Sequence, residues 1–362
     1  MKTIMVKSLP VMLIYIISHL GIIFFLYPGN IIASTNQGHW APILIGIVFH
    51  FVLILIYMKG LSFFPNKDVI SIYSGIGKIT TFLFLTPTLI YFIMVIIIAV
   101  RAYAEIINIV FLSHTPIWAI MILLLSTITY MAAKGIEVIF RTGLLLAFLF
   151  LPIILFILIL SFQNVDWRYA IPIDSDFRFI TKPVFFQSFS AFAGGFLFLG
   201  FVQPYFSYEK KGVLLAAGIL IPCFILSVYI PILTFGQSTA SPLFLPFVVV
   251  LDSTKITWLM FERVTMFFLL SLITFVIVYT SLTTWKTIRI INHYIPSIKP
   301  VFLLVSFSGL VFFTGLLIPD WKDVEKLLWW NTFFRFYSYI AIPLSLCFFG
   351  LRLVRKGKNE TI

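Results

Sequence analysis

Two adjacent glycines, Gly194 and Gly195, are the residues in this chain whose placement most suggests a ligand site. They lie deep in an apolar stretch, and each glycine in a helix interior costs about 1 kcal/mol relative to alanine. A helix that opens in lipid must satisfy its freed N–H and C=O groups, and a bound polar molecule can do this. We therefore predict a helix break at the pair. Close packing of helices through small residues is the alternative.

A second candidate break lies near the N-terminus, at Ser18, His19 and Gly21 within the apolar run Leu9–Gly29. A histidine inside a membrane span is rare and usually faces the protein interior. We predict that this segment and the glycine pair face each other and hold a small polar molecule at the bilayer midplane. The alternative is that His19 only hydrogen-bonds a neighbouring helix.

Three more side chains near the middle of apolar runs are candidates for ligand binding: Tyr91, Ser271 and Thr274. Tyr91 can close over a ligand or simply fill the core. The two hydroxyls can bind a ligand or a cation, but they can equally bond carbonyls of their own helix. These alternatives stay open at the level of sequence.

Charged residues inside or beside the apolar runs occur at helical pair spacing. Arg101 and Glu105 are four residues apart, so they can pair on one helix face, and Glu137 and Arg141 repeat the spacing. The first pair, with Arg335, is expected to form an outer gate or to reach the membrane interface by snorkelling. The second is expected to fix the connection between two spans.

No set of residues for catalysis, metal binding or cofactor binding is visible. The chain has no glycine-rich phosphate loop, no paired carboxylates inside apolar runs and no metal-ligand spacing, so neither an enzyme nor an ATP-driven pump is expected. The net charge of +12 comes from single basic residues at the ends of apolar runs, which indicates membrane topology and not nucleic-acid binding.

The composition is that of an integral membrane protein. Hydrophobic residues make up 61% of the chain and charged residues only 10%, against roughly 25% in soluble domains. About 20 apolar residues cross the hydrocarbon as a helix, and on this basis the sequence predicts ten spans. The predicted spans are Leu9–Gly29, Ala41–Met58, Thr81–Val110, Ile117–Ala133, Thr142–Phe162, Val184–Phe206, Val213–Phe235, Phe261–Trp285, Val301–Ile318 and Trp330–Leu351.

These spans predict an all-α fold, with residues 1–362 forming one polytopic membrane domain. Lysine and arginine are concentrated on the side of the N-terminus, so both termini are expected to be cytoplasmic. Two repeats of five helices, about 9–162 and 184–352, would run inverted relative to each other. Five plus five inverted helices, with the first and sixth broken, is the layout of one large transporter architecture.

The segments Arg101–Ile107, Thr115–Trp118 and Gly135–Arg141, in this order and spacing, resemble the B subunits of nutrient germinant receptors, the spore permease proteins of endospore-forming bacteria. The resemblance covers the whole chain. It implies an amino acid–polyamine–organocation transporter fold. It also implies a ligand pocket in segments 18–22 and 192–196, which adds Ile22, Phe192 and Phe196 to the candidate binding residues.

The resemblance further implies residence in the inner membrane of the spore, and partnership with an A subunit that is itself a membrane protein and a lipoprotein C subunit. The expected role is the binding of a small nutrient, often an amino acid, which triggers germination. An amino acid transporter driven by Na⁺ or H⁺ is the alternative, in which Ser271 and Thr274 would be cation ligands. A third possibility is an ion channel that opens on binding.

Overall fold

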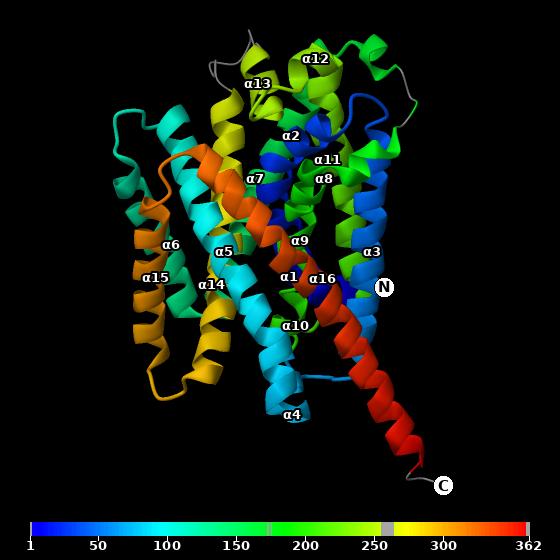
Figure 1. Cartoon of the computed structure of the whole chain (residues 1–362), viewed down its shortest axis with the longest axis vertical. Helices are drawn as coiled ribbons and strands as arrows, with labels where there is room; N and C mark the ends of the chain where they lie inside the picture. Colours follow the sequence, from blue (N-terminus) through cyan, green and yellow to red (C-terminus); the bar gives the residue numbers. More distant parts are fainter. Residues whose placement is uncertain (1, 172–173, 175, 255–263, 360–362) are drawn as a thin grey trace.

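The computed structural model describes residues 2–171, 174, 176–254 and 264–359, and every regular element in these ranges is helical (Figure 1). Seven helices are long and apolar enough to cross a membrane. They are α3 (Trp40–Ser62), α5 (Lys78–Val110), α6 (Ile117–Lys134), α7 (Ile136–Leu160), α11 (Lys210–Phe235), α14 (Val264–Tyr294) and α16 (Trp321–Asn359).

An eighth span is formed if α1 (Lys2–Ile23) and α2 (Leu26–Ser34), which are bent by 56° at a short break, are counted together. The two remaining predicted spans are helical but shorter. Helix α15 (Pro300–Leu316) has 17 residues, and the predicted span Val184–Phe206 is divided into α8 (Pro183–Ser188), α9 (Ser190–Phe196) and α10 (Leu199–Val202). The described residues thus hold seven or eight candidate spans, and the ten-span, five-plus-five arrangement stays a prediction.

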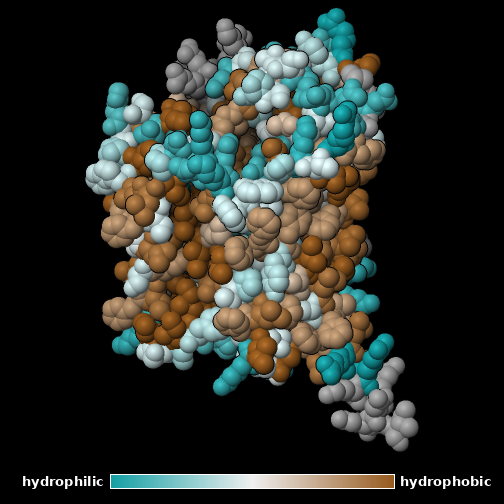
Figure 2. Space-filling model, viewed as in Figure 1, coloured by the Kyte–Doolittle hydropathy of each residue, from teal (hydrophilic) through white to brown (hydrophobic). Residues whose placement is uncertain are grey.

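Short elements cover the two ends of the bundle. Helices α12 (Gln237–Ala240) and α13 (Pro246–Ser253) lie at the top in Figure 1, and α4 (Val69–Ile76) lies at the bottom. Three 3₁₀ helices complete the set: η1 (Ser161–Asn164), η2 (Trp167–Ala170) and η3 (Phe177–Thr181). Figure 2 shows hydrophilic residues at the top and bottom of the molecule and a hydrophobic belt between them, as a membrane requires.

The core of the bundle is built around α14 and α1. In its most apolar window α14 is 72% buried, whereas α7 is only 28% buried and is therefore peripheral. Helix α1 packs against α7, α11 and α14, while α16 packs against α3 and α5 and crosses the bundle diagonally in Figure 1. Helices α6 and α7 are separated by Gly135 alone, whose φ of +90° favours glycine. Elements from distant parts of the sequence thus meet in the interior.

The first helix break was predicted at Ser18–Gly21, and this position is wrong. Helix α1 continues through that segment to Ile23, and the chain turns at Phe24 and Phe25 before α2 begins. Pro28 explains the position, since in a continuous helix its ring would clash with the carbonyl of Phe24, four residues earlier. Within α2 its missing N–H falls in the first turn, where no intrahelical partner exists.

The second break was predicted at Gly194 and Gly195, and the structure corrects this position as well. Both glycines lie inside α9, and the interruptions are at Phe189, before α9, and at Leu197–Phe198, after it. Gly195 serves a close contact instead. A Cβ atom there would lie 1.7 Å from Cε1 of His19, so this position must be glycine for α9 to approach α1.

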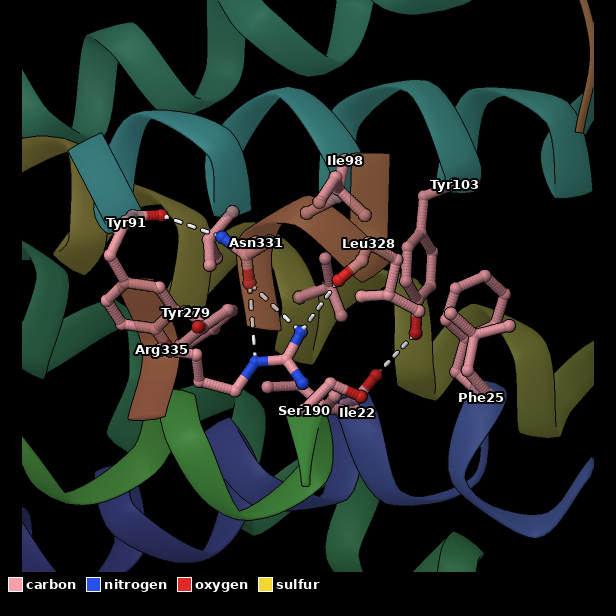
Figure 3. A pocket seen from close by; sticks show the side chains of 15 residues that line it. Ile22, Phe25, Tyr91, Ile98, Tyr103, Ser190, Tyr279, Leu328, Asn331 and Arg335 are labelled. Atoms are coloured by element: carbon pink, nitrogen blue, oxygen red, sulfur yellow. Dashed lines mark hydrogen bonds between the residues drawn. The ribbon is translucent and has the colours of Figure 1, made fainter. Parts of the chain in front are cut away.

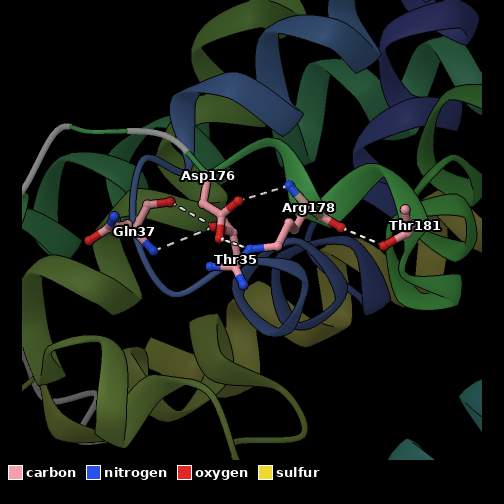
Figure 4. Close-up of polar contacts among 5 residues, drawn as sticks. All are labelled: Thr35, Gln37, Asp176, Arg178 and Thr181. Atoms are coloured by element: carbon pink, nitrogen blue, oxygen red, sulfur yellow. Dashed lines mark hydrogen bonds and ion pairs between the residues drawn. The ribbon is translucent and has the colours of Figure 1, made fainter.

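The loop between α7 and α8 uses one device twice. Asp166 is the N-cap of η2 and Asp176 is the N-cap of η3. Each carboxylate accepts hydrogen bonds from the backbone N–H and the guanidinium of the arginine two residues later. Figure 4 shows the Asp176–Arg178 pair near Thr35. The backbone N–H of Arg178, and then its guanidinium, lower the pKa of Asp176. The carboxylate therefore stays charged and the cap intact at neutral pH.

Candidate functional site

A cavity of about 60 Å³ lies inside the bundle, where α1, α2, α5, α9, α14 and α16 meet (Figure 3). At roughly 10–15 Å³ for each water, it holds a handful of waters or one small solute. Most of its wall is apolar, and its polar groups gather at one end. It is lined by Gly21, Ile22, Phe25, Leu26, Tyr91, Val95, Ile98, Ala99, Tyr103, Ser190, Val276, Tyr279, Leu328, Asn331 and Arg335.

The polar end of the cavity is formed by Arg335 and Asn331 on α16. They are four residues apart and so lie on one face of the helix. Oδ1 of Asn331 accepts hydrogen bonds from Nε and Nη2 of Arg335 at 3.3 and 3.0 Å, and Nδ2 of Asn331 donates to the carbonyl of Tyr91 at 3.3 Å. Because its amide is fixed at both ends, Asn331 holds the guanidinium in place against α5.

The break between α8 and α9 supplies the other partners of Arg335. Nη1 donates to the carbonyls of Phe186 and Gln187 at 3.4 and 3.2 Å, and Nη2 donates to the carbonyl of Leu328 at 3.4 Å. Phe186 and Gln187 lie in the last turn of α8, and both carbonyls also accept from the backbone N–H of Phe189, the residue that ends the helix. The arginine therefore adds side-chain donors to the end of α8, and the freed backbone that was predicted at Gly194 and Gly195 is not found there.

All of these partners of Arg335 are electrically neutral. The side chain is 1% exposed, and among the described residues it forms no ion pair. A buried charge is normally paired, because removal from water costs several kcal/mol. The cavity thus contains a cation whose charge no described carboxylate neutralises.

Two hydroxyls in the cavity wall also have unused hydrogen-bonding capacity. Oγ of Ser190 is buried and bonds no described residue, and the buried hydroxyl of Tyr91 has only the hydroxyl of Tyr279 beside it. By contrast, the hydroxyl of Tyr103 donates to the carbonyl of Gly21, near the end of α1. Tyr103 therefore completes the structure of the helix break, while Ser190 and Tyr91 are available to a ligand.

The second interruption in the α8–α10 segment is closed by Tyr57 on α3. Its hydroxyl donates to the carbonyl of Leu197 at 3.0 Å and accepts from the N–H of Gly200 at 3.1 Å. One buried hydroxyl thus satisfies a backbone group on each side of the gap between α9 and α10. No ligand is needed at this interruption.

The structure brings four predicted residues together at the cavity: Gly21, Ile22, Tyr91 and Arg335. The first three were expected to bind ligand, whereas Arg335 was expected at a gate. Seven other predicted binding residues do not line it: Ser18, His19, Phe192, Gly195, Phe196, Ser271 and Thr274. The surroundings of an eighth, Gly194, lie outside what the structure describes.

The rings of the predicted residues outside the cavity pack against one another, while Oγ of Ser18 and Nε2 of His19 are buried without a hydrogen-bond partner among the described residues. Nδ1 of His19 lies 2.8 Å from the carbonyl oxygen of Tyr15, one turn earlier on the same helix. The rings of His19 and His50 meet edge to face, with their centroids 5.2 Å apart. Phe192 stacks on Phe224 at 4.3 Å, and Phe196 stacks on Tyr339 at 5.0 Å. These rings form an aromatic cluster beside the cavity, and Ser18 is buried with them.

The two hydroxyls considered as cation ligands bond their own helix. Oγ of Ser271 donates to the carbonyl of Phe267 at 2.7 Å, and Oγ1 of Thr274 donates to the carbonyl of Ser271 at 2.8 Å. Within the described residues, no group of three or more histidines, cysteines or acids that could hold a metal ion is found. The observed contacts of Ser271 and Thr274 are those of the structural alternative.

Both predicted charge pairs form. Arg101 and Glu105 meet at 2.7 Å, and Arg101 also donates to the carbonyls of Ile318 and Pro319, which joins α5 to the α15–α16 connection. Glu137 and Arg141 meet at 3.4 Å on the surface, where their side chains are 71% and 81% exposed. Arg335 contacts neither pair.

The sequence interpretation missed several cavity residues that carry polar groups: Ser190, Tyr103, Tyr279 and Asn331. Asn331 could have been found from the sequence. It lies four residues before Arg335, so the two share a helix face, and polar side chains inside an apolar run are rare enough to suggest a functional contact. Ser190, Tyr103 and Tyr279 carried none, since a single hydroxyl in an apolar helix is equally compatible with a packed core.

Comparison with known proteins places the chain by family. No curated protein matches it. A family model described as "Spore germination protein" matches residues 3–323, most of the chain. Together with the long apolar helices, the match shows a multi-pass, permease-like membrane protein connected with germination. The chain therefore belongs to the spore germination protein family of spore permeases.

Proposed function

We propose that this protein is the nutrient-sensing subunit of a spore germinant receptor. The observation that carries the proposal is the small cavity inside the bundle, which has mostly apolar walls and an arginine that no described carboxylate neutralises. Largely apolar, concave sites with a few well-placed polar groups are typical of small-molecule binding. We expect the nutrient, an amino acid in the first instance, to bind in this cavity.

Signalling would follow from the position of the cavity between independently packed elements. Its wall combines α5 and α16, which pack against each other, on one side with α1 and the short helix α9, which also pack together, on the other. A ligand that contacts both sides favours the arrangement in which they are close, and so shifts the population of states of the bundle. We expect an A subunit and a lipoprotein C subunit to respond to that shift, in the inner membrane of the spore and with both termini of this chain cytoplasmic.

The proposal assigns a binding role and no catalytic one. It also puts sensing before Na⁺- or H⁺-coupled transport, because Ser271 and Thr274 make the intrahelical hydrogen bonds of structural hydroxyls. Transport through the same fold is physically possible, since fold does not fix function. Uptake is therefore measured beside binding.

The test uses the purified full chain in lipid vesicles and nanodiscs. A thermal-shift screen of amino acids, sugars and nucleosides should find a stabilising nutrient, and vesicles should not accumulate the radiolabelled form. Ala99→Leu fills the cavity and should abolish the shift, whereas Ala133→Leu makes the same change at an exposed position on α6 and should not. Saturable, concentrative uptake would contradict sensing, and an unchanged shift in Ala99→Leu would contradict the site.

A further inference from the structure

The charge of Arg335 is the feature of the cavity that says most about the ligand. An arginine side chain stays protonated and offers five N–H donors in a planar fork. Here the fork contacts an amide oxygen and three backbone carbonyls at 3.0–3.4 Å. These distances are long beside the roughly 2.7–2.9 Å typical of charge-assisted bonds to a carboxylate. The guanidinium is thus held in position by contacts that a stronger acceptor can displace.

The direction of the guanidinium fits a ligand and not a structural ion pair. Figure 3 shows it beside Ser190 and Ile22, on the cavity side of Asn331. Asn331 occupies the place where a partner carboxylate would stand one turn away, but its amide brings no charge. A carboxylate that entered the cavity would supply both the missing charge and bidentate acceptors.

The rest of the cavity limits what the carboxylate is attached to. The hydroxyls of Ser190 and Tyr91 can accept hydrogen bonds from an ammonium group, because a hydroxyl oxygen has two lone pairs. The facing wall consists of Val95, Ile98 and Ala99, which suits a short apolar side chain and offers no partner to a second charge. The volume of about 60 Å³ excludes a bulky group unless the wall moves.

We propose that Arg335 binds the carboxylate of the nutrient, that Asn331 positions the guanidinium, and that the ligand is a neutral α-amino acid with a short apolar side chain. This inference rests on the proposed function and narrows its substrate class. It places carboxylate recognition on a side chain of α16 and not on the backbone of a broken helix.

The experiment measures dissociation constants on the full chain in nanodiscs. The probes are L-alanine, L-valine and L-leucine, each beside its carboxamide, with L-phenylalanine as the bulky member and sodium chloride against sodium gluconate as the inorganic arm. Wild-type protein should bind the acids at least tenfold tighter than the amides. Arg335→Gln should weaken acid binding about 10- to 100-fold and amide binding much less, because the amide brings no charge to the guanidinium. Arg141→Gln, which removes an exposed arginine, should change neither.

The possible outcomes separate the inference from the proposed function. If acids and amides bind equally, or if a folded Arg335→Gln variant binds acids like wild type, carboxylate recognition by Arg335 is wrong while the cavity remains the site. If chloride alone stabilises the protein as well as the acids do, the arginine binds an inorganic anion and the inference is also wrong. If no probe binds, both the inference and the proposed function fail.

A variant that keeps the fold guards against trivial loss of binding. Arg335→Lys retains the charge but not the planar fork. It should keep a preference for acids over amides with affinity reduced about tenfold. A lysine variant that loses the preference entirely, at unchanged melting temperature, would overturn the role of charge.

Discussion

Arg101 and Arg335 are both buried arginines of long helices, and their surroundings differ in one respect. Arg101 is 3% exposed and has a carboxylate, Glu105, four residues along its helix at 2.7 Å. Arg335 is 1% exposed and has an amide, Asn331, at the equivalent distance in sequence on the other side. Both also bond backbone carbonyls. The first charge is neutralised within the protein, and the second is not.

This difference separates structure from function within one molecule. A neutralised, hydrogen-bonded pair has all its partners within the protein, and it ties α5 to the connection between α15 and α16. A charge left with neutral partners costs free energy in the empty protein, and a complementary ligand recovers that cost on binding. The comparison can be tested by substitutions that remove one partner of each arrangement or that give Arg335 a carboxylate partner.

The largest effect is expected from Arg101→Met. It leaves the Glu105 carboxylate without its partner, and breaking a buried pair costs about 3–5 kcal/mol, somewhat less here because Glu105 is partly exposed. Arg335→Met removes a charge that has no counter-ion and should cost less than half as much. Thermal unfolding in nanodiscs measures both. Equal losses would mean that the two arginines are equivalent.

The second-largest loss of stability is expected from Tyr57→Phe. This hydroxyl satisfies the carbonyl of Leu197 and the N–H of Gly200 without any charge. Its loss leaves two buried groups unpaired and should cost about 1–3 kcal/mol. Ser190→Ala is the matched removal of a hydroxyl, and it should leave stability nearly unchanged because Oγ of Ser190 bonds nothing described. A larger loss in the serine variant would contradict the division into structural and site hydroxyls.

Asn331→Asp converts the second arrangement into a copy of the first. A carboxylate four residues from Arg335 should neutralise the guanidinium, but the hydrogen bond from Asn331 to the carbonyl of Tyr91 is lost, so stability should change by no more than about 1 kcal/mol. It should also remove the stabilisation by amino acids, because the ligand's charge is already supplied. A variant that still binds the acids with wild-type affinity would show that the missing charge is not what the site uses.

The smallest effect is expected from Glu137→Gln. Its pair with Arg141 is exposed, so solvent and salt screen it and the change in stability should stay within about 0.5 kcal/mol. Repeating the measurement at high salt should leave the Arg101→Met loss in place and remove what little Glu137 contributes. A loss comparable to that of Arg101→Met would show that burial is not the deciding factor.

Much of the fold could be predicted from the sequence, because apolar length is a local property. The long helices and both buried and exposed charge pairs follow from runs and spacings within single helices. The break positions did not follow from glycine. Pro28 ends α1 through a steric clash with Phe24, a rule that is also local and was available.

The site was less accessible, because it is assembled from side chains far apart in the sequence. Gly21 and Gly195 are required by close contacts with Val276 and His19, and such contacts are visible only in three dimensions. The sequence position of Arg335 shows that burying its charge in the membrane costs free energy. Its neutral partners, however, come from α8 and from its own helix, and only the structure shows them. The absence of a carboxylate partner among the described residues is a property of the packed bundle.

The most direct test is a cryo-EM map of the full chain in nanodiscs with the amino acid that gives the largest thermal shift. We predict density in the cavity, with the ligand carboxylate within 3 Å of the Arg335 guanidinium and the ammonium facing Ser190. Density for the ligand at any other position, with the cavity empty or filled by side chains, would contradict the account.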